Sequence, residues 1–376
     1  MPFSGQLGYT RASMLRPHRL HLGQRTRPAL RAGVSATVAA WFATAASCAA
    51  STPPPAEVTP AEAPDATAAV ADDSSARLPL TEREAELVSE LEHDVRELAG
   101  EIGERNTAEG WNLASATDTL AEKLEQAGYA VERQGFVPAD DAVAQNLVVT
   151  VRGGARGDQT VVVGAHYDSA AKCPGADDNA SGVAALLALA RRFASKRPSR
   201  TLRFVAFATQ EGPHWRNAEM GSTVYAKRLA AAGEKVVAML SLESLGYYSD
   251  EPGSQQSAEG CSDCFGPVAD YAAVLGNEAS SKLVDDLVRA LTVSCSLPIR
   301  GGVLPGDHSV LAAADHWAFW QVGYPAVVVT DTGPLRYAHH HRLTDTPERL
   351  DYERMARLVA GLELAISELV GCPATG

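Results

Sequence analysis

The sequence predicts a single α/β domain with a mixed, largely parallel central sheet flanked by helices on both faces. After residue 127, segments of strand-like composition alternate with segments of helical periodicity, which is typical of α/β domains. Two segments, 161–163 and 327–329, contain valine at every position, and a strand that is apolar at consecutive positions is buried on both faces. Polar residues of the metal-binding type also follow a predicted strand, where open α/β sheets place their ligand sites.

The predicted domain spans residues 80–376 and begins with two helices, at 81–105 and 117–127. The apolar residues of the first helix recur at helical spacing: Leu87, Leu91, Val95 and Leu98. The expected strands are 146–151, 160–165, 202–208, 236–242 and 326–330. The expected helices among and after them are 181–195, 222–232, 280–293 and 352–370.

The charge distribution excludes some classes of partner. The chain has a net charge of −13 from 33 basic and 46 acidic residues. Residues 1–48 contain six arginines and no acidic residue, so the remainder has 27 basic residues against 46 acidic ones, a net charge of −19. A body of this charge repels nucleic acid and anionic membrane surfaces and suits a protein that binds cations.

The segment 1–48 has the pattern of an export signal. Arginines precede an apolar run at 32–46, which is too short to span a bilayer. The run ends in Ala45-Ala46-Ser47-Cys48, which resembles a bacterial lipoprotein cleavage box, although Ala45 stands where a leucine is usual. We therefore expect an exported protein, either attached to the membrane through a lipid on Cys48 or secreted after cleavage. A misassigned start without a signal is the third alternative.

The segment 49–79 is rich in alanine and proline, so we expect a disordered linker between the export signal and the folded domain. Export also permits disulfides, and the pair Cys261 and Cys264 could form one. A zinc site at this pair is the alternative, but no second pair of cysteines has matching spacing.

Two neighbouring segments carry the main chemical signal: Gly164-Ala165-His166-Tyr167-Asp168-Ser169 and Pro174-Gly175-Ala176-Asp177-Asp178-Asn179-Ala180-Ser181-Gly182. His166 ends a predicted strand and offers a nitrogen suited to zinc. Asp168 can orient that imidazole from behind. An aspartate in the second segment can present both carboxylate oxygens and bridge two metal ions.

These two segments resemble the zinc exopeptidase family of secreted bacterial aminopeptidases, which also includes aminopeptidase Y and the glutaminyl cyclases. The similarity extends from about Leu80 to Cys372. It implies an α/β fold, a peptide substrate and two Zn²⁺ ions, with Asp178 as the bridging ligand.

The resemblance implies three further ligands. Glu211 follows the strand 202–208, Glu243 ends the strand 236–242, and His341 lies four residues before Asp345. His339 and His340 compete with His341 on chemistry alone, and the spacing favours His341. One ion would then be held by His166 and Glu243, and the other by Glu211 and His341.

One position departs from the family pattern. Relatives have a glutamate before the ligand Glu211, and this glutamate is the general base, but here the residue is Gln210. A carboxamide cannot hold a transferable proton near neutral pH. The enzyme would then be slow, or another carboxylate such as Glu219 or Asp315 would take the proton, or the protein would be a metal-binding pseudopeptidase. A glutaminyl cyclase is a further alternative, which would use one zinc ion.

Other residues are candidates for the substrate cleft. The segment Asp315-His316-Trp317 resembles one that lies near the cleft in relatives, and a capped helix start explains it equally well. Aromatic residues that could line a specificity pocket, or belong to the core, are Trp215, Tyr247 and Tyr248. Arg342 could bind a substrate carboxylate or simply be exposed.

Overall fold

A computed structural model describes residues 78–138, 140, 142–258, 265–306, 308 and 314–372. The predicted export signal with Cys48, nearly all of the predicted linker, and the pair Cys261 and Cys264 lie outside the described residues. None of the described helices is both long enough and apolar enough to span a membrane. Cys173, Cys295 and Cys372, the cysteines within the described ranges, are not in disulfides.

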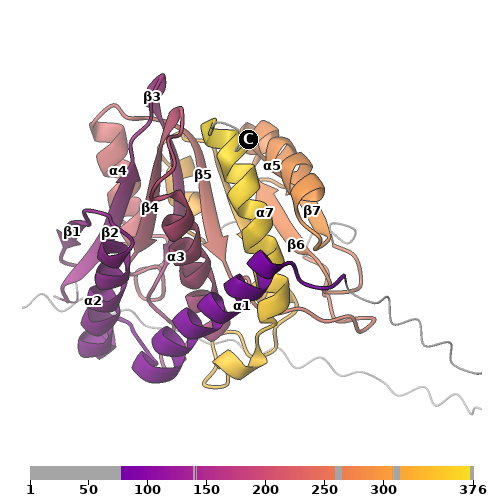
Figure 1. Cartoon of the computed structure of the whole chain (residues 1–376). Coiled ribbons are helices and arrows are strands. Elements are labelled where there is room, and N and C mark those ends of the chain that lie inside the picture. The colour runs from indigo at the N-terminus through magenta and orange to yellow at the C-terminus, as the bar shows by residue number, and fades with distance from the viewer. Residues whose placement is uncertain are drawn as a thin grey trace, which may run out of the picture. The chain divides into compact units, whose positions relative to one another are not determined.

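A twisted mixed sheet forms the centre of the domain (Figure 1). In the described part of the chain it has eight strands in the order β1-β2-β4-β3-β5-β8-β6-β7. Strands β4, β3, β5 and β8 are mutually parallel, β6 and β7 are parallel to each other, and β1, β2 and β6 make the antiparallel pairings. The bounds are β1 Glu132–Phe136, β2 Ala144–Val151, β3 Arg156–His166, β4 Arg200–Phe207, β5 Lys235–Glu243, β6 Ala272–Gly276, β7 Ile299–Val303 and β8 Ala326–Thr330.

Helices cover both faces of this sheet, as the sequence predicts (Figure 1). One face is covered by α1 Glu82–Val95, α2 Gly110–Gln126, α3 Gly182–Phe193, α5 Ser281–Ser294 and α7 Tyr352–Val370. The other face is covered by α4 Gly221–Ala231 and α6 His316–Trp320. The predicted fold class is therefore confirmed.

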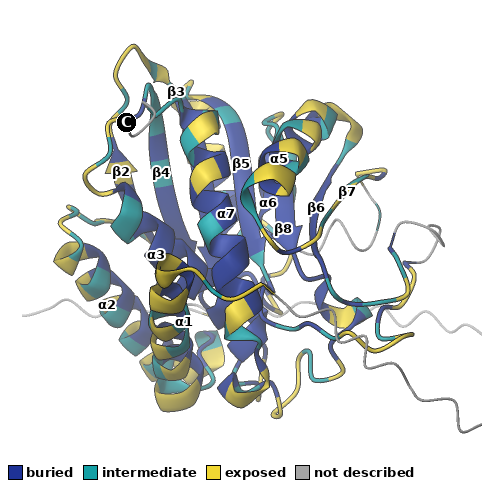
Figure 2. Ribbon diagram, turned by 45° about the vertical axis from the view of Figure 1, so that its right-hand side comes forward, coloured by how far each residue is buried: buried dark blue, intermediate teal, exposed yellow. Residues whose placement is uncertain are grey.

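The strand β3 shows why its valines are consecutive. Val161 and Val163 belong to the core beneath α3, whereas Val162 belongs to the core beneath α4 and α6. All three side chains are fully buried because successive residues of a strand point to opposite faces. Figure 2 shows the central strands buried along most of their length and the helices exposed only on their outer sides.

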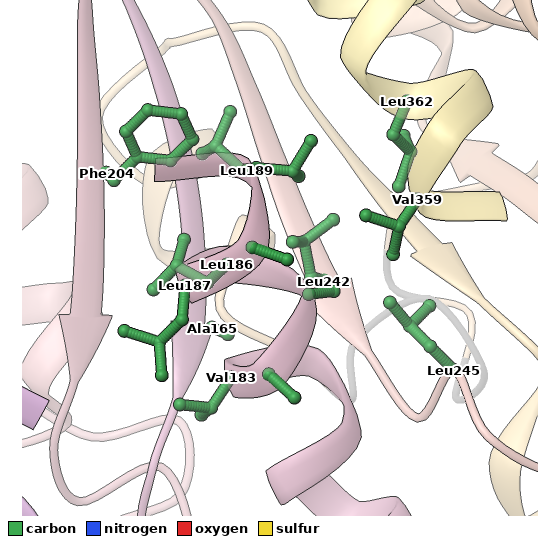
Figure 3. Packing of buried hydrophobic residues seen from close by; sticks show 14 of the residues in the cluster. Ala165, Val183, Leu186, Leu187, Leu189, Phe204, Leu242, Leu245, Val359 and Leu362 are labelled. Carbon is green, nitrogen blue, oxygen red and sulfur yellow. The ribbon is translucent and has the colours of Figure 1, made fainter. Parts of the chain in front are cut away.

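Helix α3 is the central packing element of the larger core. Leu186 and Leu189 lie among Ala165 of β3, Leu242 of β5 and Val359 of α7 (Figure 3). This apolar contact fixes the start of α3 against the strand ends. The site loop 174–182 leads directly into that start, so the core positions the site.

The predicted elements agree with the structure to different degrees. Both β8 and α7 have the predicted bounds, whereas α2 begins at Gly110, seven residues before the predicted start. The predicted first helix is observed as α1 followed by a π-helical segment, Arg96–Ile102. Strands β1, β6 and β7 were not predicted. Strands β1 and β7 are the largely exposed edges of the sheet, whereas β6 lies inside it with all five of its residues buried.

Candidate metal centre

The predicted ligand residues converge at one edge of the sheet. His166 is the last residue of β3, Glu243 is the last residue of β5, and Glu211 follows the end of β4 by four residues. Because β4, β3 and β5 are adjacent and parallel, their carboxyl ends meet at this edge.

A first group of donor atoms lies around His166. Its Nε2 atom lies 3.3 Å from Oδ1 of Asp178 and 3.3 Å from Oε1 of Glu243. His166 and Asp178 are both buried. The three donor atoms lie within 4.8 Å of one another, which is the spacing expected of ligands to one metal ion.

A second group lies on the other side of Asp178. Nε2 of His341 lies 3.0 Å from Oδ2 of Asp178 and 3.2 Å from Oε1 of Glu211. His340 also reaches Asp178, with its Nδ1 atom 3.2 Å from the same Oδ2. Asp178, His340 and His341 form a compact group of donors, and Glu211 adjoins it through His341. Asp178 is therefore shared by two groups through its two oxygens.

The donor atoms fit a pair of zinc ions. Zinc bonds to nitrogen and carboxylate oxygen are about 2.0–2.2 Å long, so neighbouring ligand atoms of a tetrahedral ion lie roughly 3.3–3.6 Å apart. Most of the separations above are close to this range. In addition, some donor atoms are buried without a hydrogen-bond partner among the described residues, which is unfavourable unless a cation binds them: Asp178 Oδ1, Glu211 Oε1, Glu243 Oε2 and His340 Nδ1.

Asp168 lies behind His166, as expected. Its Oδ1 atom lies 3.3 Å from Nδ1 of His166, the ring nitrogen that faces away from Asp178. The same carboxylate accepts backbone hydrogen bonds from Gln210 (3.0 Å) and Glu211 (2.9 Å). Asp168 thus orients one proposed ligand and holds the loop that carries another.

The loop that carries Asp178 is attached to the loop that carries His341. Oδ1 of Asp345 accepts the backbone N–H of Asp177 (2.9 Å), and its Oδ2 accepts that of Asp178 (3.2 Å). Tyr337 donates its hydroxyl to the same carboxylate at 3.0 Å. The aspartate that the sequence motif places four residues after His341 therefore connects the two loops.

A second set of contacts attaches the Asp178 loop to the end of β5. The side chain of Asn179 donates to the carbonyl oxygen of Leu242 (2.9 Å) and accepts the N–H of Ser244 (3.1 Å). Asp177 accepts the N–H of Gly246 at 2.8 Å. These bonds fix Asp178 relative to Glu243, which lies between Leu242 and Ser244 in the chain.

Arg105 supports the site from beneath, and no sequence signal points to it. Its guanidinium is fully buried and donates to the backbone carbonyls of Tyr167 (2.7 Å) and Gly175 (2.9 Å) and to that of Pro174. Burial lowers the pKa of Arg105 to about 10, so the group stays cationic at neutral pH. Through these hydrogen bonds Arg105 holds the two motif segments together. Gly175 there has a φ of 64°, a conformation that favours glycine.

Two of the donor groups, Glu243 and His341, hold protons at neutral pH when no cation is present. Burial raises the pKa of Glu243 to about 8. Burial also acts on Asp178, but the nearby imidazoles, His340 first among them, keep its pKa well below the usual value. Contacts with the carboxylates of Asp178 and Glu211 raise the pKa of His341 to about 10. A metal ion would replace these protons, so metal binding would be coupled to proton release.

A cavity of about 720 Å³ opens beside the donor atoms. Its lining includes the proposed ligands Asp178, Glu211, Glu243 and His341, together with His340 and Gln210. Small and apolar residues form most of the remaining wall, including Ala170, Ala171, Ala314, Val328, Pro334 and Leu335. Among the described lining residues, the donor residues carry the only ionisable side chains.

Gln210, which the resemblance aligns with the general base, lines this cavity next to Glu211. The two carboxylates considered as replacements do not line the cavity in the described part of the chain. Glu219 lies 3.3 Å from Nδ1 of His214. Asp315 is fully buried, and burial raises its pKa to about 6. Neither location supports a role in taking a proton from the cavity.

The remaining predicted site residues separate into two groups. Trp215 lines the cavity, as expected, and Ala314 does so in place of Asp315 and His316, which are buried. Tyr248 is in the core, and the ring of Tyr247 packs at a tilt against that of Tyr337; neither tyrosine is among the described residues that line the cavity. Two further residues are not among the described residues that line the cavity. His339 contacts Thr344 at 2.7 Å, and Arg342 is exposed.

Comparison with known proteins agrees with this geometry. The profile of Peptidase family M28 matches residues 146–364, more than half of the chain. The protein YfbL of Escherichia coli (strain K12), described as uncharacterized, is 35% identical over 294 residues, which cover 76% of this chain and 89% of YfbL. The fold and the donor groups define a metal-dependent hydrolase of the metallopeptidase class. The chain belongs to Peptidase family M28.

Solved structures show the same fold. A zinc aminopeptidase from Bacillus subtilis aligns with a TM-score of 0.60 at 15% identity, over 75% of this chain and 95% of that one. A glutaminyl cyclase from Fimbriiglobus ruber aligns with a TM-score of 0.55 at 20% identity, over 74% of this chain and 94% of that one. At these identities the likeness concerns the architecture.

Proposed function

We propose that the protein is a dizinc aminopeptidase that removes apolar residues from the N-terminus of peptides. The observation that carries this proposal is the sharing of Asp178 by two donor groups at the wall of one cavity. The fold neighbour from Bacillus subtilis is a zinc aminopeptidase, which supports the choice of an exopeptidase.

The proposed ligands are His166, Glu243 and Asp178 for one ion and Asp178, Glu211 and His341 for the other. A pair of such ions would polarise the scissile carbonyl and lower the pKa of a water molecule between them. Asp168 keeps His166 in the orientation that ligation requires.

The wall of the cavity supports a preference for apolar side chains. Val328 and Leu335 form part of this wall. Every charged side chain among the described lining residues belongs to a proposed metal ligand or to His340 beside it. A charged substrate side chain placed there would lose its hydration without gaining a partner. The cavity, with a volume of about 720 Å³, leaves room for a large substrate side chain such as that of leucine or phenylalanine.

Because Gln210 cannot act as a general base, we propose that the enzyme is slow. Loss of a general base reduces the rate by about 10²–10⁴-fold, and the structure places Glu219 and Asp315 away from the cavity wall. A metal-binding pseudopeptidase is therefore a second candidate, and Gln210 is the observation that favours it. A glutaminyl cyclase has the same fold, but it would leave one of the two donor groups without a metal ion.

The test uses the purified full-length protein. Metal analysis should find two zinc ions per chain, and peptides with free N-termini should release their first residue while N-acetylated peptides do not. His166→Ala should lose one ion and the activity. Two bound ions without release of any amino acid would indicate a pseudopeptidase. Cyclisation of an N-terminal glutamine with one bound ion would indicate a glutaminyl cyclase.

We also propose that the enzyme acts outside the cytoplasm, on the strength of the export pattern in residues 1–48. Cell fractionation with labelling by radioactive palmitate tests this. A lipid label that disappears in Cys48→Ala would support an anchor at Cys48. Protein found only in the cytoplasm would contradict export.

A further inference from the structure

The three consecutive histidines do not behave alike. His339 contacts Thr344 through its Nδ1 atom at 2.7 Å, away from Asp178. His340 and His341 both approach Oδ2 of Asp178, at 3.2 Å and 3.0 Å. The spacing of the sequence motif selects one histidine, whereas the structure brings two imidazoles to the same carboxylate oxygen.

The backbone explains this arrangement. Adjacent residues of an extended chain point in opposite directions, but His341 has a φ of 56°, in the left-handed region. Its ring stacks on that of His340, with centroids 4.0 Å apart and planes inclined by 18°. The turn therefore presents both rings to Asp178, at the cost of a backbone conformation that a non-glycine residue seldom adopts.

The contact between His340 and Asp178 is not an aligned hydrogen bond. Nδ1 of His340 is buried and has no hydrogen-bond partner among the described residues, even though Oδ2 of Asp178 is only 3.2 Å away. A ring that merely steadied the carboxylate would direct an N–H at that oxygen. His340 and His341 each offer a donor atom to the same compact group with Asp178, and binding one ion together would turn their stacked rings until the two nitrogens converge on it.

We propose that His340 is a sixth metal ligand and binds, through Nδ1, the same ion as His341. The proposal rests on the dizinc site proposed above and adds a donor to it. That ion would have two imidazoles besides the carboxylates of Asp178 and Glu211, whereas the ion at His166 would have one imidazole. Imidazole nitrogen is a good ligand for zinc, copper, iron and nickel, whereas magnesium, calcium and manganese prefer oxygen ligands. The position at His341 should therefore discriminate more strongly against these hard cations than the position at His166.

The bonds to the metal can be observed directly. The full-length protein is prepared with ¹⁵N-labelled histidine and loaded with ¹¹³Cd²⁺, which binds zinc sites and couples through one bond to a ligating nitrogen. We expect couplings to Nε2 of His166, Nε2 of His341 and Nδ1 of His340. The Nδ1 coupling should vanish in His340→Ala and persist in His339→Ala, the matched control.

Zinc affinity, measured by competition with a chelator, gives the second readout. His340→Ala should weaken one of the two sites about tenfold or more, and His339→Ala should leave both unchanged. A lower affinity without an Nδ1 coupling in the wild type would overturn the proposal, because His340 would then act on Asp178 from outside the coordination sphere. Couplings to His166 and His341 alone would overturn it and leave the dizinc site standing. No bound metal at all would overturn both.

Discussion

Asp168 lies 3.3 Å from Nδ1 of His166, and its carboxylate also accepts the backbone N–H groups of Gln210 and Glu211. The backbone carbonyl oxygen of Asp168 also lies 3.2 Å from the same Nδ1, so this one residue orients the imidazole at the end of β3 and holds the chain after β4. Since His166 and Glu211 belong to different donor groups, Asp168 connects the two halves of the proposed dizinc site.

Asp168→Asn should weaken zinc binding by about 10- to 100-fold, because an amide keeps the size of the side chain but loses the negative charge beside the imidazole of His166. Competition with a chromogenic chelator measures this affinity. Asp158→Asn is the control, since Asp158 lies on the same strand with 73% of its side chain exposed. Equal affinities in the two variants would show that Asp168 does not orient a ligand.

Gln210→Glu should raise kcat/KM for peptide cleavage at least about tenfold, because it places a proton acceptor at the wall of the cavity. Zinc content, measured on the same samples, should not change. Gln210→Ala is the companion variant and should not gain activity. Unchanged activity of Gln210→Glu at full zinc content would mean that residue 210 does not occupy the position of the base.

Leu335→Asp should change the preference among N-terminal residues. Leu335 lines the cavity and is only partly buried, so a carboxylate is tolerated there better than at a fully buried position such as Val328. The ratio of kcat/KM for lysine over leucine peptides should rise at least about tenfold, because the new charge pairs with the ammonium group. Leu335→Asn controls for size and polarity. An equal change in the asparagine variant would argue against a charge effect.

The sequence predicts the central strands well because their pattern is strong. The parallel strands β3, β4, β5 and β8 are buried on both faces, so their apolar residues are continuous and their positions are clear. The edge strands β1 and β7 have no such pattern, and their pairing depends on tertiary context. Strand β6 is apolar and fully buried, but its alanines and glycine have low strand propensity, so the sequence does not mark it as a strand. Local residues cannot specify such pairings.

The proposed ligands are predictable because each lies in a motif at the end of a strand or in a loop with fixed spacing. Arg105 is not predictable, because it acts through backbone carbonyls that only the fold brings near it. The role of His340 depends on the left-handed backbone at His341, which no residue type announces. Motif spacing therefore identifies donors, whereas the contacts that position them come from the three-dimensional structure.

Tyr337→Phe should lower the free energy of unfolding by about 1.5–3 kcal/mol, because it removes a buried hydrogen bond to the carboxylate of Asp345. It should also weaken zinc binding, since Asp345 holds the backbone of Asp178. Urea unfolding and chelator competition measure the two effects. Tyr129→Phe, which removes a bond to the carbonyl oxygen of Ala190 far from the site, should cost less stability and leave zinc binding unchanged. Identical zinc affinity in both variants would exclude the proposed coupling.

The metal-free protein should lose stability as the pH rises from about 5 to 8. Burial raises the pKa of four carboxyl groups around the site, to about 8 for Glu243 and to about 6 for Asp315, Asp331 and Asp345. These groups keep their protons in the folded state at a pH where the unfolded chain has released them. Their contribution is therefore present below their unfolded values and is lost as the pH rises through the folded ones.

Most other shifted groups of the site act in the same direction, whereas burial lowers the pKa of His340, whose contribution therefore acts in the opposite direction below the unfolded value near 6.5. The pKa of His341 is raised to about 10 by Asp178 and Glu211, so its contribution is likewise lost as the pH rises above the unfolded value near 6.5. The pKa of Asp178 is depressed, and its contribution is lost only in acid, below the usual range of an aspartate. Saturating zinc replaces the protons, so the gain in melting temperature on adding zinc should grow from pH 5 to pH 8. A gain that is the same at both pH values would show that the ligands Glu243 and His341 do not hold these protons in the metal-free fold.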